Sequence, residues 1–255
     1  MVSLFTGAAQ AITNGTPDGE NHPYVCIVVF FDAAGNPLWY TTGTLISPTI
    51  VLTAGHGTFG TTTAKVWFET NVGTTGFPYN SIYQGTPFTC IGYLSAPTGK
   101  GVPTSDYHDV GIVRLSTAVQ GITPAQLPGV GSADKLPMKA PVDLLGYGAQ
   151  VQQKGSGVSP YDSWRANGYR YYASAQVITS KGVLSGEFME VTANPGQDKG
   201  GIAFGDSGGP IFKAGTNIII GINSFVTNSN CAGVTYAQRI DIADILGWIE
   251  KASTS

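Results

Sequence analysis

A serine set among glycines is the first feature of this chain that could do chemistry. Residues 205–210 read Gly-Asp-Ser-Gly-Gly-Pro, which predicts a tight turn carrying Ser207 and an apolar strand after Pro210. Glycine at position 205 lets the backbone approach a reacting carbonyl without a side chain in the way. The backbone N–H groups of Gly205 and Ser207 could then stabilise an oxyanion. Similar fragments occur in ordinary turns, so the motif alone leaves a purely structural role open.

A nucleophilic serine needs a base, and His56 stands in a suitable setting. It follows a β-rich stretch that ends in Thr53, Ala54 and Gly55, small residues that leave room for an imidazole beside a cleft. A lone histidine after a strand is more often a surface or core residue. The functional interpretation of His56 therefore depends on the Ser207 motif.

Both segments resemble motifs of the chymotrypsin-like (S1) serine peptidases. The hexapeptide at 205–210 resembles the nucleophile motif of that family. Residues 53–56 resemble its Thr-Ala-Ala-His segment, with glycine in place of one alanine. The resemblance extends from about Ile12 to the C-terminus and implies that Ser207 is the nucleophile and His56 its base.

The resemblance also supplies the third member of a catalytic triad. Asp109 stands directly before an alternating apolar strand and matches the family's Asp-Ile-Ala-Leu-Leu segment. Its nearest competitor, Asp106, lies in a stretch typical of an exposed loop. The chain order His56, Asp109, Ser207 is the chymotrypsin order. The implied role of Asp109 is to orient the imidazole and to stabilise its charged form.

The composition indicates an all-β protein. The 35 glycines are about twice the average usage, charged residues make up only 11%, and turn residues interrupt short β-rich runs about every ten positions. At 255 residues the chain has a length at which a twin-barrel fold forms one unit. The resemblance implies two packed six-stranded antiparallel β-barrels with a C-terminal α-helix.

Expected boundaries follow from the same resemblance. The N-terminal barrel spans about 12–118, a proline-rich connection 119–140, the C-terminal barrel 141–240 and the helix 241–252. Helical spacing of apolar residues supports this helix, with Asp241 as N-cap and Asp244 in its first turn, and the family packs it on the second barrel. Residues 1–11 are interpreted as a truncated leader or a remnant. Residues 152–173 form a tyrosine-rich insertion that either shapes substrate access or is a solvated loop.

Charge and hydropathy narrow the classes of partner. A net charge of −3 provides no basic surface for nucleic acid, and no apolar run approaches the length of a membrane span. We expect no cofactor and no catalytic metal, because no His, Cys and Asp cluster has metal-ligand spacing; a calcium loop is left open. The resemblance implies a secreted, monomeric serine endopeptidase that acts on peptide or protein substrates and can meet a protein inhibitor. An esterase with the same triad and a non-catalytic binding protein on the same fold are the alternatives.

The specificity pocket of the family maps onto a few positions. Gly201 corresponds to the base of the pocket, so no carboxylate is present there to receive Lys or Arg. Asp198 is nearby but is more typical of a solvated loop charge. Ser224, Phe225 and Val226 resemble the edge that pairs with the substrate backbone, and valine in place of glycine would narrow the pocket. These substrate-binding positions predict a small-to-medium apolar residue at P1, directly before the cleaved bond.

Cysteine usage departs from the family pattern. The bridge that closes the histidine loop maps onto Thr41 and Gly57, so both of its cysteines are absent. Cys231 is predicted to be unpaired, because its expected partner position holds alanine. Cys26 and Cys90 remain, and whether they pair is left open. Our hypothesis is that packing alone holds the histidine loop.

Ile12 opens a segment that resembles the mature N-terminus of the family. In many members, cleavage before this residue frees an ammonium group that pairs with the aspartate beside the nucleophile, here Asp206. Bacterial relatives often form the site without that pair. The sequence leaves open whether this chain must be cut.

Overall fold

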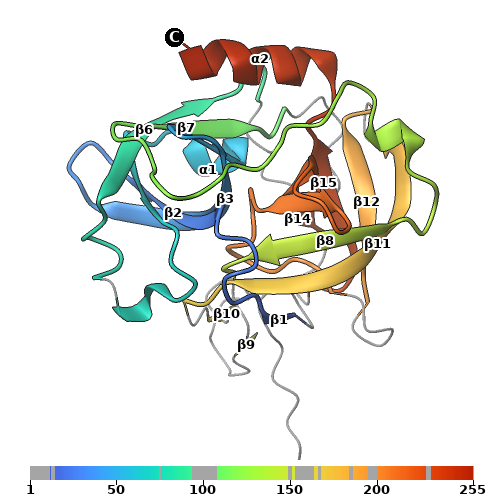
Figure 1. The fold of residues 1–255 in the computed structure, drawn as a ribbon, viewed down its shortest axis with the longest axis horizontal. Helices are drawn as coiled ribbons and strands as arrows, with labels where there is room; N and C mark the ends of the chain where they lie inside the picture. Colours follow the sequence, from blue (N-terminus) through green and yellow to red (C-terminus); the bar gives the residue numbers. More distant parts are fainter. Residues whose placement is uncertain are drawn as a thin grey trace, which may run out of the picture.

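The structure, a computed structural model, describes residues 12, 15–74, 76–93, 108–148, 151–152, 164–165, 168–183, 186–194, 200–227 and 231–254. Its strands form two closed antiparallel barrels that lie beside each other (Figure 1). The predicted fold of two six-stranded barrels and a C-terminal helix is confirmed. Among the described residues, neither α-helix has the length and apolar character needed to cross a lipid bilayer.

The first barrel closes in the strand order β2-β3-β4-β7-β6-β5. Its strands are β2 (Val25–Phe31), β3 (Pro37–Ser47), β4 (Ile50–Thr53), β5 (Thr63–Trp67), β6 (Tyr83–Thr89) and β7 (Gly111–Leu115). A short helix α1 (Gly55–Thr58) follows β4, and a 3₁₀ turn η1 (Val72–Thr74) follows β5.

The second barrel closes because β8 pairs with both β11 and β13. Its strands are β8 (Pro141–Gly146), β11 (Tyr171–Val183), β12 (Phe188–Ala193), β13 (Pro210–Lys213), β14 (Ile219–Val226) and β15 (Gly233–Arg239). The short strand β1 (Thr16–Pro17) adds to β11, and β9 (Val151–Gln152) pairs with β10 (Trp164–Arg165) outside both barrels. A 3₁₀ turn η2 (Ala133–Lys135) lies in the connection between the barrels.

Strand β2 shows how one run of apolar residues serves two cores. All its residues are buried, and successive side chains point to opposite faces of a strand. Cys26, Val28 and Phe30 belong to the cluster inside the first barrel. The alternate residues, such as Ile27 and Val29, belong to a second cluster in the seam between the barrels. A continuous apolar sequence is therefore required here, because neither face meets water.

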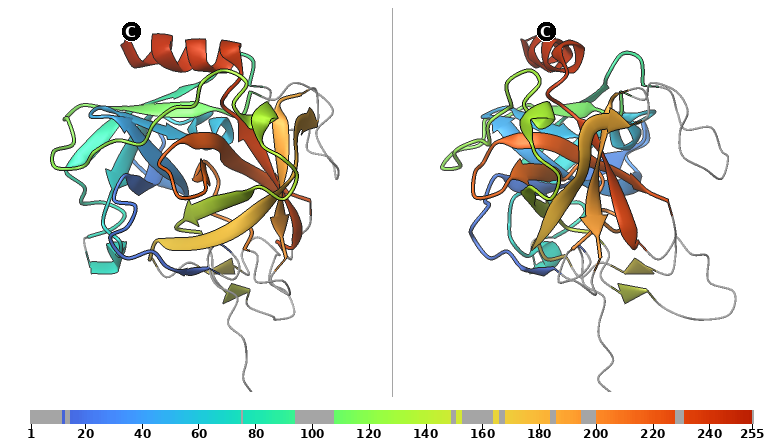
Figure 2. Two further views of the ribbon diagram at one scale, coloured as in Figure 1. Left: turned by 45° about the vertical axis from the view of Figure 1, so that its right-hand side comes forward. Right: turned by 90° about the vertical axis from the view of Figure 1, so that its right-hand side faces the viewer.

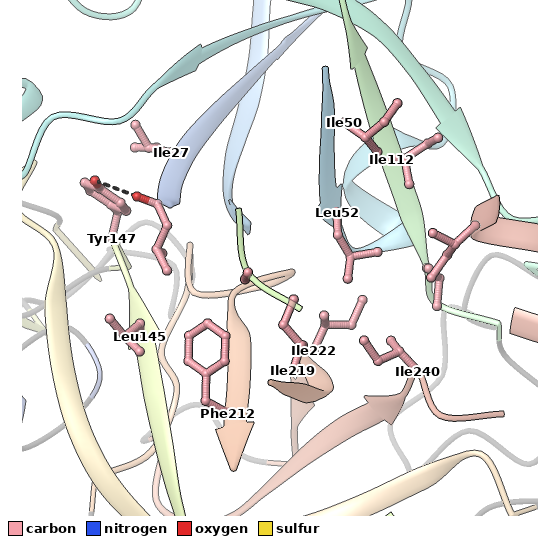
Figure 3. Packing of buried hydrophobic residues seen from close by; sticks show 14 of the residues in the cluster. Ile27, Ile50, Leu52, Ile112, Leu145, Tyr147, Phe212, Ile219, Ile222 and Ile240 are labelled. Carbon is pink, nitrogen blue, oxygen red and sulfur yellow. Dashed lines mark hydrogen bonds between the residues drawn. The ribbon is translucent and has the colours of Figure 1, made fainter. Parts of the chain in front are cut away.

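The seam contains a large cluster of buried apolar side chains from both barrels. Figure 3 shows side chains of the first barrel facing side chains of the second across it. The labelled members are Ile27, Ile50, Leu52, Ile112, Leu145, Tyr147, Phe212, Ile219, Ile222 and Ile240.

One buried cation also joins the barrels at this seam. Arg170, directly before β11, is 1% exposed and its Nε donates to Asp18 Oδ2 at 2.8 Å. Its Nη1 donates to the carbonyl oxygens of Val25 and Phe68 in the first barrel, at 2.9 and 3.1 Å. It also donates to the Tyr147 hydroxyl at 3.1 Å. Arg170 thereby fastens the N-terminal segment to both barrels.

The C-terminal helix α2 (Ala243–Thr254) differs from expectation in its start and its neighbour. Asp244 lies in its first turn as predicted, but the helix begins at Ala243, so Asp241 stands one position ahead of the cap. The Asp241 carboxylate instead binds the Arg239 guanidinium at 2.9 Å and accepts the backbone N–H of Ala133 at 2.8 Å. The helix also packs beside β7 of the first barrel, where Arg114 Nη2 donates to Ala252 O at 2.5 Å (Figures 1 and 2). The expectation that it packs on the second barrel is therefore wrong.

Candidate active site

His56 lies in α1, and two glycines let this short helix pack closely on the segment that leads into β7. A Cβ atom at Gly55 would lie 2.9 Å from the backbone nitrogen of Val110. One at Gly111 would lie 2.6 Å from the side chain of Thr58. The glycine that replaces the family alanine before His56 therefore stands where the backbone has little room for a methyl group.

The carboxylate of Asp109 is bound by His56 through two groups. Asp109 Oδ1 accepts the backbone N–H of His56 at 2.7 Å, and Oδ2 lies 2.9 Å from the imidazole Nδ1. Ser224 Oγ donates to the same Oδ2 atom. Burial works to raise the pKa of Asp109, but the His56 charge and these hydrogen bonds outweigh it and the pKa is lowered. Asp109 is therefore ionised at neutral pH.

The imidazole of His56 is oriented by this contact. Burial works to lower the pKa of His56, but the charge of Asp109 and its hydrogen bond outweigh burial and raise it. Because Nδ1 is bound to Asp109, Nε2 is the ring nitrogen that can exchange a proton with another group. The His56 side chain remains 36% exposed, so that group can reach it.

Ser207 lies on a turn that both barrels hold. Gly205 and Gly208 have φ angles of 99° and 76°, a region that favours glycine. Thr42 of β3 donates its backbone N–H to Ser207 O and its hydroxyl to Gly205 O, both at 2.9 Å. From the second barrel, Asn223 O of β14 accepts the N–H of Gly208 at 2.7 Å.

The backbone N–H groups of Gly205 and Ser207 remain available. Within the described part of the chain, neither donates a hydrogen bond to a protein acceptor. A Cβ atom at Gly205 would lie 2.5 Å from the ring of Tyr40, so only glycine fits beside this ring. Two unpaired donors next to a serine are the arrangement that can bind a developing oxyanion.

One cavity brings these groups together. It has a volume of about 250 Å³ and is lined by Trp39, Tyr40, Thr41, His56 and Ser207. Within the described residues, Ser207 makes no side-chain hydrogen bond to His56. His56 thus contacts Asp109 directly, whereas His56 and Ser207 line the same cavity without a hydrogen bond between their side chains.

Asp206, next to the serine, is fully buried and accepts three backbone N–H groups. Its Oδ1 binds Gly148 N at 2.8 Å, and its Oδ2 binds Ala203 N at 2.8 Å and Ile12 N at 3.1 Å. Burial raises the pKa of Asp206 to about 6, although these hydrogen bonds act in the opposite direction. In this uncut chain a peptide N–H of Ile12 thus occupies the place where family members bring an ammonium group.

The residues expected to bind substrate have different surroundings. Gly201 is buried. The Phe225 ring stacks on Tyr236 with centroids 4.7 Å apart, and half-buried Val226 packs against the cluster that contains Cys231. The sequence predicts Ser224 only at the substrate edge, yet its hydroxyl donates to the carboxylate of Asp109.

Several expectations fall outside the described residues. These are the alternative carboxylate Asp106, the loop charge Asp198, the leader at 1–11 and most of the insertion at 152–173.

The histidine loop has no bridge, but more than packing holds it. A Cβ atom at Gly57 would lie 2.8 Å from Cγ2 of Thr41, so the two positions that carry cysteine in the family are in contact. Trp39 Nε1 donates to Gly57 O at 2.9 Å, and the hydroxyls of Thr41 and Thr53 lie 3.0 Å apart. The hypothesis of packing alone is therefore wrong, because hydrogen bonds contribute as well.

The three cysteines are free and buried. Cys231 is unpaired, as predicted. Cys26 faces the interior of the first barrel while Cys90 lies in the seam cluster, so these two do not pair. Burial raises the pKa of each thiol. Among the described residues, no group of three or more His, Cys, Asp and Glu side chains is arranged to hold a metal ion.

Three residues at the site were not identified by sequence reasoning. Tyr40 and Trp39 line the cavity, and Thr42 binds the serine turn. Their position within two residues of Thr41, which matches a family cysteine, was the available signal.

Solved structures with the same fold include peptidases and proteins of other description. A structure of HL collagenase has a TM-score of 0.70 at 17% identity, covering 95% of this chain and 98% of that chain. Human heparin binding protein has a TM-score of 0.63 at 16% identity, with coverage of 93% and 94%. A scabies mite inactivated protease paralogue, S-I1, has a TM-score of 0.62 at 18% identity, with coverage of 93% and 97%. At these identities the likeness establishes the fold alone.

Comparison at the level of sequence identifies the family. A search of curated proteins found no match to the chain. The sequence model described as Trypsin matches residues 14–249, which is most of the chain. With the two barrels and the site geometry above, this match shows that the chain belongs to the trypsin family of serine peptidases.

Proposed function

We propose that this protein is a serine endopeptidase that cleaves peptide bonds through an acyl-enzyme on Ser207. The observation that carries the proposal is the position of His56. Its Nδ1 lies 2.9 Å from the Asp109 carboxylate, while its ring lines the same cavity as Ser207. A base oriented in this way is what a serine hydroxyl needs to become an attacking group.

The proposed reaction has two halves. A rotation of the Ser207 side chain brings Oγ to His56 Nε2, since such contacts often tighten only when substrate is bound. Oγ then attacks the scissile carbonyl while Nε2 takes its proton, and Asp109 stabilises the imidazolium. The free N–H groups of Gly205 and Ser207 bind the oxyanion. His56 passes the proton to the leaving amine, and water repeats the sequence to release the acid.

A serine-directed phosphonate and a peptide library test this proposal. We expect stoichiometric labelling at Ser207, and a loss in kcat of about 10⁴-fold or more in Ser207→Ala with an unchanged Tm. His56→Ala should abolish labelling as well. A Ser207→Ala variant that keeps most of its activity would refute the assignment. Absence of both labelling and hydrolysis in the wild type would favour a non-catalytic protein, and hydrolysis of esters alone would favour an esterase.

The proposed preference at P1 is for a small-to-medium apolar residue. It is supported by the absence of a carboxylate at Gly201 and by the valine side chain at position 226. Chromogenic peptides that differ only at P1 provide the measurement. Faster cleavage after Lys or Arg than after Ala, Val or Leu would contradict the preference.

We further propose that the intact chain is competent without cleavage before Ile12. The Ile12 N–H already binds Asp206, and both oxyanion donors are free. N-terminal sequencing of phosphonate-labelled protein should therefore find residues ahead of Ile12. Labelled material that always begins at Ile12 would show that cleavage is required. Because trypsin-family proteins are generally extracellular, we propose a secreted monomer acting on peptide or protein substrates.

A further inference from the structure

The backbone that presents Asp109 forms a tight and strained turn. His108 has a φ angle of 38°, which is uncommon for a residue other than glycine. Val110 N–H donates to His108 O at 2.6 Å, which closes the turn around Asp109. A strained backbone persists only where surrounding contacts impose it. The contacts of His108 and Asp109 must therefore supply that constraint.

Two side chains of the second barrel accept the N–H groups of this turn. Gln238 Oε1, on β15, accepts the N–H of Asp109 at 3.0 Å. Glu187 Oε2, directly before β12, accepts the N–H of His108 at 3.0 Å. Gln238 is 0% exposed and Glu187 is 7% exposed, so water does not readily replace either hydrogen bond.

The two acceptors are also bound to each other. Gln238 Nε2 donates to the backbone oxygen of Glu187 at 3.1 Å and lies 3.5 Å from its Oε2 atom. Arg239 N–H donates to the same Glu187 oxygen at 2.8 Å. Since Nε2 faces oxygen atoms and Oε1 faces an N–H group, the Gln238 amide has one orientation that satisfies its surroundings. The pair therefore forms a fixed unit.

Two other titratable side chains, His108 and Cys90, lie close enough to Glu187 to interact with its carboxylate. His108 Nδ1 lies 3.1 Å from Glu187 Oε1, within ion-pair distance but out of line for a hydrogen bond. Burial, and to a smaller extent the charge of Glu187, raises the pKa of the buried Cys90 thiol to about 12. The thiol is therefore neutral near pH 7.

We propose that Glu187 and Gln238 are positioning residues that hold the Asp109 turn at the geometry His56 requires. The inference rests on the proposed peptidase function, because it assigns both residues a part in that reaction. Ser224 binds the Asp109 carboxylate, whereas this unit binds the backbone that carries it. Glu187 and Gln238 belong to the second barrel, which also carries Ser207. Their hydrogen bonds therefore connect the Asp109 turn of the first barrel to the barrel that carries the nucleophile.

Kinetics of matched variants provide the first test. Gln238→Met keeps the side-chain length but removes the acceptor, and Glu187→Ala removes the other acceptor. Each should lower kcat about 10- to 100-fold with a smaller change in KM. Glu187→Gln keeps an acceptor for the His108 N–H and should restore most of the activity. The control is Asp134→Ala, which removes an ion pair to Arg239 without touching the turn.

Titration of the His56 imidazole by NMR is a readout that needs no turnover. In Gln238→Met and Glu187→Ala the pKa of His56 should fall, because a displaced Asp109 carboxylate raises it less. In Glu187→Gln and Asp134→Ala it should match the wild type. An unchanged His56 pKa in Gln238→Met and Glu187→Ala would overturn the proposal, as would an equal fall in Asp134→Ala. If the wild type cleaves no peptide but the pKa still shifts, the peptidase function fails and the positioning role stands.

Discussion

The histidine loop offers a sharp test of the local geometry, because a disulfide can be introduced where the family has one. The perturbation is the double substitution Thr41→Cys and Gly57→Cys. A Cβ atom at position 57 would lie 2.8 Å from Thr41 Cγ2, the place a sulfur atom would take. This is close to the roughly 3 Å that disulfide geometry sets between one sulfur and the partner Cβ. The same Cβ would lie 3.3 Å from the Phe30 ring, which must move by a few tenths of an ångström.

The expected gain in stability follows from the loop that the bridge closes. A loop of about 17 residues reduces the entropy of the unfolded chain by an amount worth about 3 kcal/mol. Loss of the contact between the hydroxyls of Thr41 and Thr53, 3.0 Å apart, offsets about 1 kcal/mol of this. The net gain of about 2 kcal/mol corresponds to a rise in Tm of roughly 4–8 °C for a chain of this size.

Thermal unfolding of the oxidised and reduced double variant measures this gain. Thiol titration in denaturant should find the three native thiols in the oxidised protein and two more after reduction. Each single variant serves as a control for the loss of its native side chain. If the two new cysteines stay reduced under oxidising conditions, or if the bridge lowers Tm, then Thr41 and Gly57 are not in the contact described.

Three further predictions concern the packing and charges around the site. Gly55→Ala should cost about 1–3 kcal/mol and lower kcat/KM, because the new methyl group meets the Val110 nitrogen; full activity with an unchanged Tm would contradict this. Asp206 has a pKa of about 6 against an ordinary value of 3.8, so the folded state binds its proton more tightly than the unfolded state. The free energy of unfolding of the intact chain should therefore fall as pH rises from about 4 to about 6, and fall less in Asp206→Asn; equal slopes in denaturant titrations would rule this out. Arg170→Met should cost about 3–5 kcal/mol, because it takes the guanidinium away from Oδ2 of the buried Asp18 carboxylate. Adding Asp18→Asn should recover part of that loss, and strictly additive effects in the double-mutant cycle would show that the two do not interact.

The two-barrel fold could be predicted from the resemblance to a family, whereas the strands and the serine turn have local determinants. Gly205 and Gly208 have positive φ angles, which favour glycine. The residue type alone therefore indicates the backbone conformation of this turn. The alternation of apolar residues before and after each turn likewise predicts strands.

What the sequence could not reveal depends on contacts between distant segments. The sequence predicts Ser224 at the substrate edge, but its hydroxyl binds Asp109, a residue far away in the chain. Gln238 and Glu187 carry no motif, and only the closure of the second barrel brings them to the same turn. Asp241 has the residue type and place of a helix cap, yet a nearby arginine binds its carboxylate. Tertiary partners of this kind outcompete local preferences.

The two-sided burial of β2 has a consequence for how the chain finds its register. In a strand with one wet face, a slip by one residue is penalised because it turns apolar groups toward water. A slip of β2 by one residue would exchange the side chains inside the barrel with those in the seam, and all of them would remain buried. Shape must then discriminate between the two alignments. Gly43 on β3 discriminates between the alignments by shape. A Cβ atom at this position would lie 2.7 Å from the Val51 side chain and 3.0 Å from that of Val28. The space left by the missing side chain is therefore filled by Val28 in the observed register of β2 and β3.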